Sequence, residues 1–116
     1  MGMKRALTIP CAVGASMSLM LLSNIAIASE LADAGRAIAG AKCSRCHATG
    51  AVGASPHKEA PPFRELARRY PIDNLAEAFA EGLSVGHADM PEFRLSVRQT
   101  NALLAYLQSI QTSKSR

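Results

Sequence analysis

The distribution of apolar and charged positions divides the chain near residue 29. Residues 6–29 include no charged residue and consist mainly of Leu, Ile, Met and Ala. Beyond them, apolar residues recur at helical spacing in four stretches, 31–42, 62–69, 73–81 and 96–111. No stretch alternates apolar and polar residues over the length of a strand. The pattern predicts an all-α fold of four to five short helices.

The first and last predicted helices have the clearest apolar faces. The face of the first helix is Leu31, Ala34, Gly35, Ile38 and Ala39. The face of the last is Val97, Leu103, Leu104, Leu107 and Ile110, with Tyr106 beside it. Between them, residues 49–62 are rich in glycine and proline and predict a loop. Asp73 is a candidate N-cap of the third helix, and Gly82 is expected to end it.

The N-terminal segment has the features of a cleaved secretory signal. Lys4 and Arg5 precede the apolar run, which ends in the small-residue pattern Ala26-Ile27-Ala28. We expect cleavage after Ala28, leaving residues 29–116 as one domain. The alternative is an uncleaved membrane anchor, although serine, glycine and asparagine dilute the run. Cys11 lies too early for a lipoprotein cleavage site and is interpreted as part of the signal.

Composition is informative once this segment is set aside. The apolar fraction of 48% includes the signal, and aromatic residues make up only 4%, with no tryptophan. The formal net charge of +4 falls to +2 when Lys4 and Arg5 are removed. Since no arginine-rich block is present, we expect no nucleic-acid partner.

The strongest motif is Cys43-Ser44-Arg45-Cys46-His47, the Cys-x-x-Cys-His pattern of c-type haem attachment. Two thiols at this spacing can bond the two vinyl groups of a porphyrin, and the next imidazole can reach the iron. A thioredoxin-like pair would require strands around the motif, and a zinc site would require further ligands. The motif predicts one haem c, attached covalently through Cys43 and Cys46, with His47 as a metal ligand.

A second axial ligand is expected after His47, and the candidates are Met90, His87 and His57. Met90 is the only methionine of residues 29–116, and Pro91 restrains its backbone. We therefore favour Met90, with His87 or an open position as alternatives. His57, between Pro56 and Lys58, is interpreted as a solvated loop histidine.

Four short helices would bury too little apolar surface to be stable alone. A covalently bound porphyrin would supply a large apolar surface that every helix can contact. The low aromatic content agrees with a core built around such a group.

The order of these features resembles class I cytochrome c, and the similarity extends over residues 29–111. Gly35 matches the glycine at the crossing of the terminal helices, and Tyr106 matches the aromatic residue that packs there. Ala60-Pro61-Pro62-Phe63 resembles the family's Gly-Pro-x-Leu segment. The resemblance implies that the Pro61 carbonyl accepts a hydrogen bond from His47 and that Met90 is the distal ligand. Ala39 and Ala60 depart from the family pattern. The four-helix-bundle class of cytochrome c has its Cys-x-x-Cys-His motif near the C-terminus, whereas here the motif lies near the start of residues 29–116.

The resemblance implies an exported, periplasmic electron carrier that is not an enzyme and cycles between Fe(III) and Fe(II). The alternatives are a haem-bearing subunit of a larger oxidoreductase and a gas-binding protein or haem enzyme. Partners would dock transiently at the haem edge, and we expect a monomer. The basic residues either form a rim that attracts acidic partners or are ordinary surface; they are Lys42, Arg45, Lys58, Arg64, Arg68 and Arg69. Arg68, Arg69 and Tyr70 are candidates for bonding the haem propionates.

Overall fold

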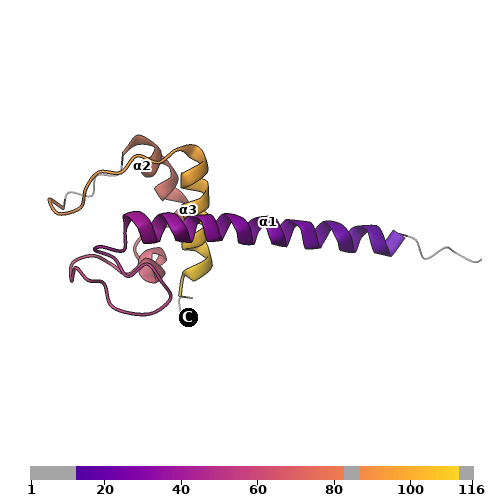
Figure 1. The fold of residues 1–116 in the computed structure, drawn as a ribbon, viewed down its shortest axis with the longest axis horizontal. Helices are drawn as coiled ribbons and strands as arrows, with labels where there is room; N and C mark the ends of the chain where they lie inside the picture. Colours follow the sequence, from indigo (N-terminus) through magenta and orange to yellow (C-terminus); the bar gives the residue numbers. More distant parts are fainter. Residues whose placement is uncertain (1–12, 83–86, 113–116) are drawn as a thin grey trace, which may run out of the picture.

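The computed structural model describes residues 13–82 and 87–112. Three α-helices and two 3₁₀ helices follow one another in these segments (Figure 1). They are α1 (Val13–Lys42), η1 (Phe63–Arg68), η2 (Ile72–Asn74), α2 (Leu75–Glu81) and α3 (Val97–Ile110). The described segments hold no β-strand. The predicted all-α fold is therefore confirmed.

Helix α1 is longer than the sequence pattern predicted. The expected helix began at residue 31, whereas α1 begins at Val13 and its N-terminal part projects away from the other elements (Figure 1). Residues 13–42 include no proline, so nothing in the sequence interrupts the helix. In the projecting part, Ile25 and Ile27 are 67% and 64% exposed.

The structure does not bear on cleavage after Ala28, which stays a prediction. Lys4, Arg5 and Cys11 lie outside the described residues. Among the residues that are described, we find no helix with the length and hydropathy required to cross a bilayer.

The main contact of the fold is the crossing of α1 and α3 (Figure 1). Gly35 is buried at this crossing. A β-carbon on Gly35 would overlap the Ala102 carbonyl and would lie only 2.7 Å from the Tyr106 β-carbon. The absence of a side chain at Gly35 therefore lets the two helix backbones approach closely, as the family resemblance implied.

Helix α3 begins with a complete capping box. The Ser96 hydroxyl accepts a hydrogen bond from the Gln99 backbone N–H, and the Gln99 side chain accepts one from the Ser96 N–H. The predicted apolar face is largely correct, since Leu103 and Leu107 are each 1% exposed. Val97 was wrongly assigned to this face and is 73% exposed. It occupies the first helical position, ahead of the turns that contact other elements.

The second and third predicted helices are present with altered ends. The second is the 3₁₀ helix η1 rather than an α-helix. Asp73 is not an N-cap, because it lies within η2 and α2 starts after Asn74, which has no side-chain capping bond. Its carboxylate instead accepts a hydrogen bond of 2.6 Å from Gln108 of α3. Gly82 ends α2 with φ = 112°, as predicted.

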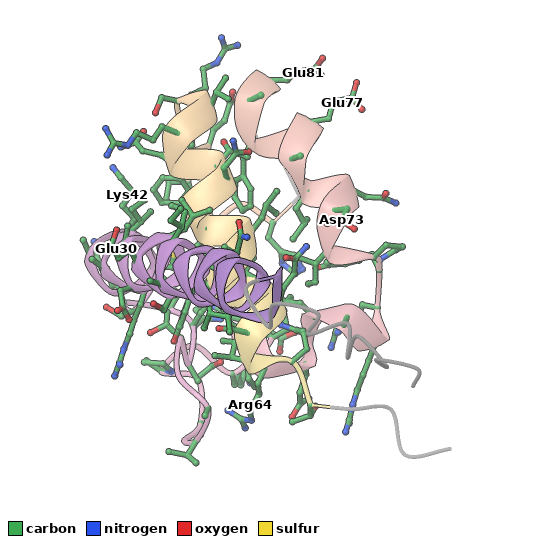
Figure 2. All side chains as sticks on the ribbon, turned by 90° about the vertical axis from the view of Figure 1, so that its right-hand side faces the viewer. Glu30, Lys42, Arg64, Asp73, Glu77 and Glu81 are labelled. Atoms are coloured by element: carbon green, nitrogen blue, oxygen red, sulfur yellow. The ribbon has the colours of Figure 1, made fainter. Side chains whose placement is uncertain are left out.

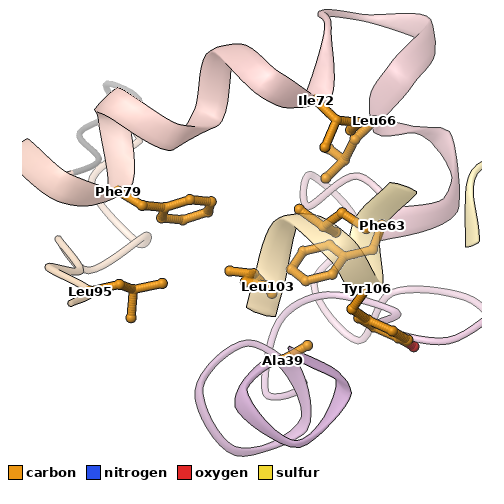
Figure 3. Packing of buried hydrophobic residues seen from close by; sticks show 9 residues of the cluster. Ala39, Phe63, Leu66, Ile72, Phe79, Leu95, Leu103 and Tyr106 are labelled. Atoms are coloured by element: carbon orange, nitrogen blue, oxygen red, sulfur yellow. The ribbon is translucent and has the colours of Figure 1, made fainter. Parts of the chain in front are cut away.

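The apolar core gathers around Leu103 of α3 (Figure 3). Phe63 and Leu66 of η1 lie on one side of Leu103, and Phe79 and Leu95 lie on the other. Residues from every described helix contribute to this cluster.

Candidate haem-binding site

The Cys-x-x-Cys-His segment forms a tight turn at the end of α1. The Cys43 N–H donates to the Ala39 carbonyl at 2.9 Å, which continues the helical pattern. The Cys46 and His47 N–H groups both donate to the Cys43 carbonyl, at 3.1 and 2.9 Å. These backbone bonds place both thiols and the imidazole at one end of α1. Cys43 and Cys46 are partly buried and form no disulfide.

The environment of Cys43 differs from that of a reactive thiolate. Burial raises the pKa of the Cys43 thiol to about 11, although the positive charge of Lys42 opposes this effect. Redox-active Cys-x-x-Cys pairs depend on a lowered thiol pKa. The raised pKa of the partly buried Cys43 thiol therefore argues against the thioredoxin-like alternative.

The His47 ring is held on two sides. Its Nδ1–H donates to the Pro61 carbonyl at 2.8 Å, the contact implied by the family resemblance. The Phe63 ring lies against it, with 5.0 Å between ring centroids and 46° between planes. Because Nδ1 is occupied, Nε2 is the nitrogen available to a metal.

The loop that follows the motif is tied back to it by backbone hydrogen bonds. The His57 N–H donates to the Cys46 carbonyl at 3.1 Å, and the Phe63 N–H donates to the Ala48 carbonyl at 2.9 Å. The Tyr106 hydroxyl of α3 donates to the Thr49 carbonyl at 2.7 Å. These bonds fix the path of residues 48–63 and so the position of the Pro61 carbonyl.

A cavity of about 990 Å³ lies between the motif and the segment that contains Met90. Both thiols and His47 line it, and so does Met90. Its walls are mainly apolar and include Phe63, Leu66, Phe79, Leu103 and Leu107. A cavity of this size with an apolar wall fits one haem. The two thiols could bond the porphyrin edge, and the imidazole and the thioether could bind the iron.

All three candidates for the distal position line this cavity. Met90 is half-buried, and its N–H donates to the His87 carbonyl at 3.1 Å, which closes a turn. The Leu95 N–H donates to the Phe79 carbonyl at 3.0 Å and ties the end of this segment to α2. His87 is exposed. Met90 is thus less exposed to solvent than His87.

His57 is more constrained than the solvated loop histidine that we expected. Its side chain is 37% exposed, and its Nδ1 accepts a hydrogen bond of 3.2 Å from the Glu59 N–H. Its Nε2 lies 3.5 Å from a carboxylate oxygen of Asp89, the residue before Met90. His57 therefore links the loop after the motif to the Met90 segment. Sequence spacing gave no indication of this contact, because it depends on how the two loops meet.

Three of the six basic residues lie at the cavity. Lys42, Arg45 and Arg69 line the haem cavity, as does Tyr70. Arg64 instead donates a 2.9 Å hydrogen bond to the Gly53 carbonyl.

Acidic residues follow the outer side of η2 and α2, where Asp73, Glu77 and Glu81 lie in a row (Figure 2). Lys42 and Arg64 lie elsewhere on the molecule, away from this row (Figure 2). The surface thus carries basic groups at the cavity and acidic groups along α2.

The fold and the site together define a small monohaem cytochrome of the c type. The model of the family described as cytochrome c oxidase, cbb3-type, subunit III matches residues 30–107, well over half of the chain. The chain belongs to this family of c-type cytochromes, and haem c attached through Cys43 and Cys46 is its cofactor. Comparisons with curated proteins and with solved structures gave no match.

Proposed function

We propose that this chain is an exported one-electron carrier whose iron is held by His47 and Met90. The observation that carries the proposal is the cavity that His47 and Met90 both line, with the two thiols at its edge. When bound, haem supplies an iron that cycles between Fe(III) and Fe(II).

Each chain residue has a defined task in this function. Pro61 orients His47 and strengthens it as a ligand by accepting its Nδ1–H bond. Met90 presents a thioether, which favours the reduced iron relative to a second histidine. The apolar walls exclude water and, like Met90, favour the less charged, reduced state of the haem. None of these tasks requires a substrate or an acid–base pair, so we propose a carrier rather than an enzyme.

The ligand assignment is tested with Met90→Ala and the control His87→Ala. We expect Met90→Ala to keep its haem, lose the long-wavelength methionine–iron absorption band of the oxidised protein and bind carbon monoxide when reduced. Its midpoint potential should fall. His87→Ala should retain the band and resist carbon monoxide. If the band is absent from the unaltered protein and only His87→Ala opens the reduced iron to carbon monoxide, His87 is the ligand. Carbon monoxide binding by the unaltered protein would favour a gas-binding protein.

Export to the periplasm is the second part of the proposal. It is supported by the signal-like residues 1–28 and by a cofactor that bacteria attach outside the cytoplasm. The test is the mass and N-terminal sequence of the protein purified from a bacterium that matures c-type cytochromes. A chain beginning at Ser29 in the periplasmic fraction is expected. An intact N-terminus in the membrane fraction would instead identify an anchored protein.

A second candidate function is a haem-bearing subunit of a larger oxidoreductase. The observation that favours it is the description of the matching family as an oxidase subunit. The native assembly distinguishes the two functions. A free carrier should elute as a monomer from its own host's extract on size exclusion, whereas a subunit should co-elute with oxidoreductase activity at high mass.

A further inference from the structure

Gln111, directly after α3, forms hydrogen bonds that the proposed function does not use. Its Nε2 group donates to the Phe63 carbonyl at 2.8 Å and to the Leu107 carbonyl at 2.7 Å. Its Oε1 accepts from the Ala67 N–H at 2.8 Å. One half-buried side-chain amide therefore bonds to both the first turn and the later part of η1.

The neighbouring residue reinforces this contact. The Thr112 N–H and hydroxyl both donate to the Arg64 carbonyl, at 3.0 and 3.2 Å. Helix η1 has no side-chain cap of its own, since its N-cap residue is Pro62. A six-residue 3₁₀ helix has weak internal hydrogen bonding. Gln111 and Thr112, directly after α3, thus form four hydrogen bonds with η1.

Holding η1 also fixes the surroundings of His47. Phe63, the first residue of η1, packs its ring on His47 and donates its N–H to Ala48, next to His47. Pro61 lies two residues before Phe63 and accepts the His47 Nδ1–H. We expect a shift of Phe63 away from α3 to move the Pro61 carbonyl, because the fixed φ of Pro62 and the restricted backbone of Pro61 limit how the connection can adjust.

We propose that Gln111 is a positioning residue for His47, acting through Phe63 and Pro61. By holding η1, its amide keeps the Pro61 carbonyl aligned with the His47 Nδ1–H. The inference rests on the proposed function, in which His47 binds the iron. An ordinary helix C-cap would need only the bond to Leu107, whereas two of the three bonds reach η1.

The test measures solvent exchange of the His47 Nδ1–H by NMR in reduced holoprotein labelled with ¹⁵N-histidine. We expect exchange about tenfold faster in Gln111→Ala, because local opening no longer has to break the amide's bonds to η1. Gln108→Ala is the matched control. Gln108 lies three residues earlier, and among the contacts described its side chain bonds only Asp73. In Gln108→Ala, the exchange rate of the His47 Nδ1–H should stay within about twofold of the rate in the unaltered protein.

Gln111→Glu keeps an acceptor for the Ala67 N–H but loses the donor to Phe63, and it replaces Gln111→Ala if that variant fails to retain haem. The His47 Nδ1–H should also exchange faster in Gln111→Glu than in the Gln108→Ala control. Equal rates in the Gln111 and Gln108 variants, or an unchanged rate in the Gln111 variants, would overturn the positioning role. Strong upfield ring-current shifts of the His47 ring protons report ligation separately. Their absence in the unaltered protein would refute the proposed function, whatever the exchange rates.

Discussion

The crossing of α1 and α3 yields the sharpest stability prediction, through Gly35→Ala. The new β-carbon would overlap the Ala102 carbonyl and press on the Tyr106 β-carbon. Both belong to the facing helix and neither is the flexible end of a side chain, so the helices must move apart. Overpacking of this kind costs about 1–3 kcal/mol and occasionally more. Alanine returns about 1 kcal/mol of helix propensity. Because the overlap is with backbone, we take the upper end of the range, about 3 kcal/mol, so the free energy of unfolding should fall by about 2 kcal/mol.

Gly40→Ala provides the control on the same helix. Gly40 is exposed, and a β-carbon there would meet nothing within 4 Å. Only the propensity gain remains, so stability should rise by up to about 1 kcal/mol. The assay is urea unfolding of the holoproteins, followed by far-ultraviolet circular dichroism and haem absorbance. A loss of about 2 kcal/mol lowers the midpoint by roughly 1 M urea.

The relative stability of Gly35→Ala and Gly40→Ala decides whether the reasoning holds. If Gly35→Ala is as stable as Gly40→Ala, the helices do not need a glycine to cross as closely as the structure indicates. A second informative result would be different unfolding transitions by circular dichroism and by haem absorbance. They would show that the crossing and the haem site do not unfold together, contrary to a single shared core.

Three further predictions concern the cofactor and the hydrogen bond from α3. Cys43→Ala or Cys46→Ala should retain haem poorly on a haem-stained denaturing gel, because one thioether is lost; full retention would contradict their assignment. Tyr106→Phe should lower the free energy of unfolding by about 1 kcal/mol, since the partly buried Thr49 carbonyl loses its donor; an unchanged urea midpoint would argue against this bond. The apoprotein should be largely disordered by circular dichroism, because the chain cannot fill a cavity of about 990 Å³; a well-folded apo form would refute the haem-centred core.

Local features of this protein were predictable from sequence because they depend on near neighbours. The Cys43–His47 turn is closed by bonds within five residues, so the motif itself specifies it. Ser96 and Gln99 form the capping box of α3, and the last helix was expected to begin at Ser96. Gly82 ends α2 because its φ of 112° suits glycine.

Features that join distant segments were missed or misassigned. Aspartate is a common N-cap residue, yet the Asp73 carboxylate bonds to Gln108, 35 residues away. Val97 fits the periodicity of α3, yet it is exposed because the neighbouring elements contact later turns. The first helix was expected to begin at residue 31, whereas α1 begins at Val13, because residues up to Ala28 were interpreted as a signal and not assessed as a helix.

The sequence by itself determined the helical class, the covalent attachment motif and the candidate ligands, since periodicity and spacing encode them locally. The tertiary structure decided what surrounds these groups. It brought Met90 and His47 to one cavity, linked His57 to Asp89 and aimed the Gln111 amide at η1. These contacts depend on how loops and helix ends meet in space, because a polar side chain bonds to whichever partner the fold brings within about 3 Å.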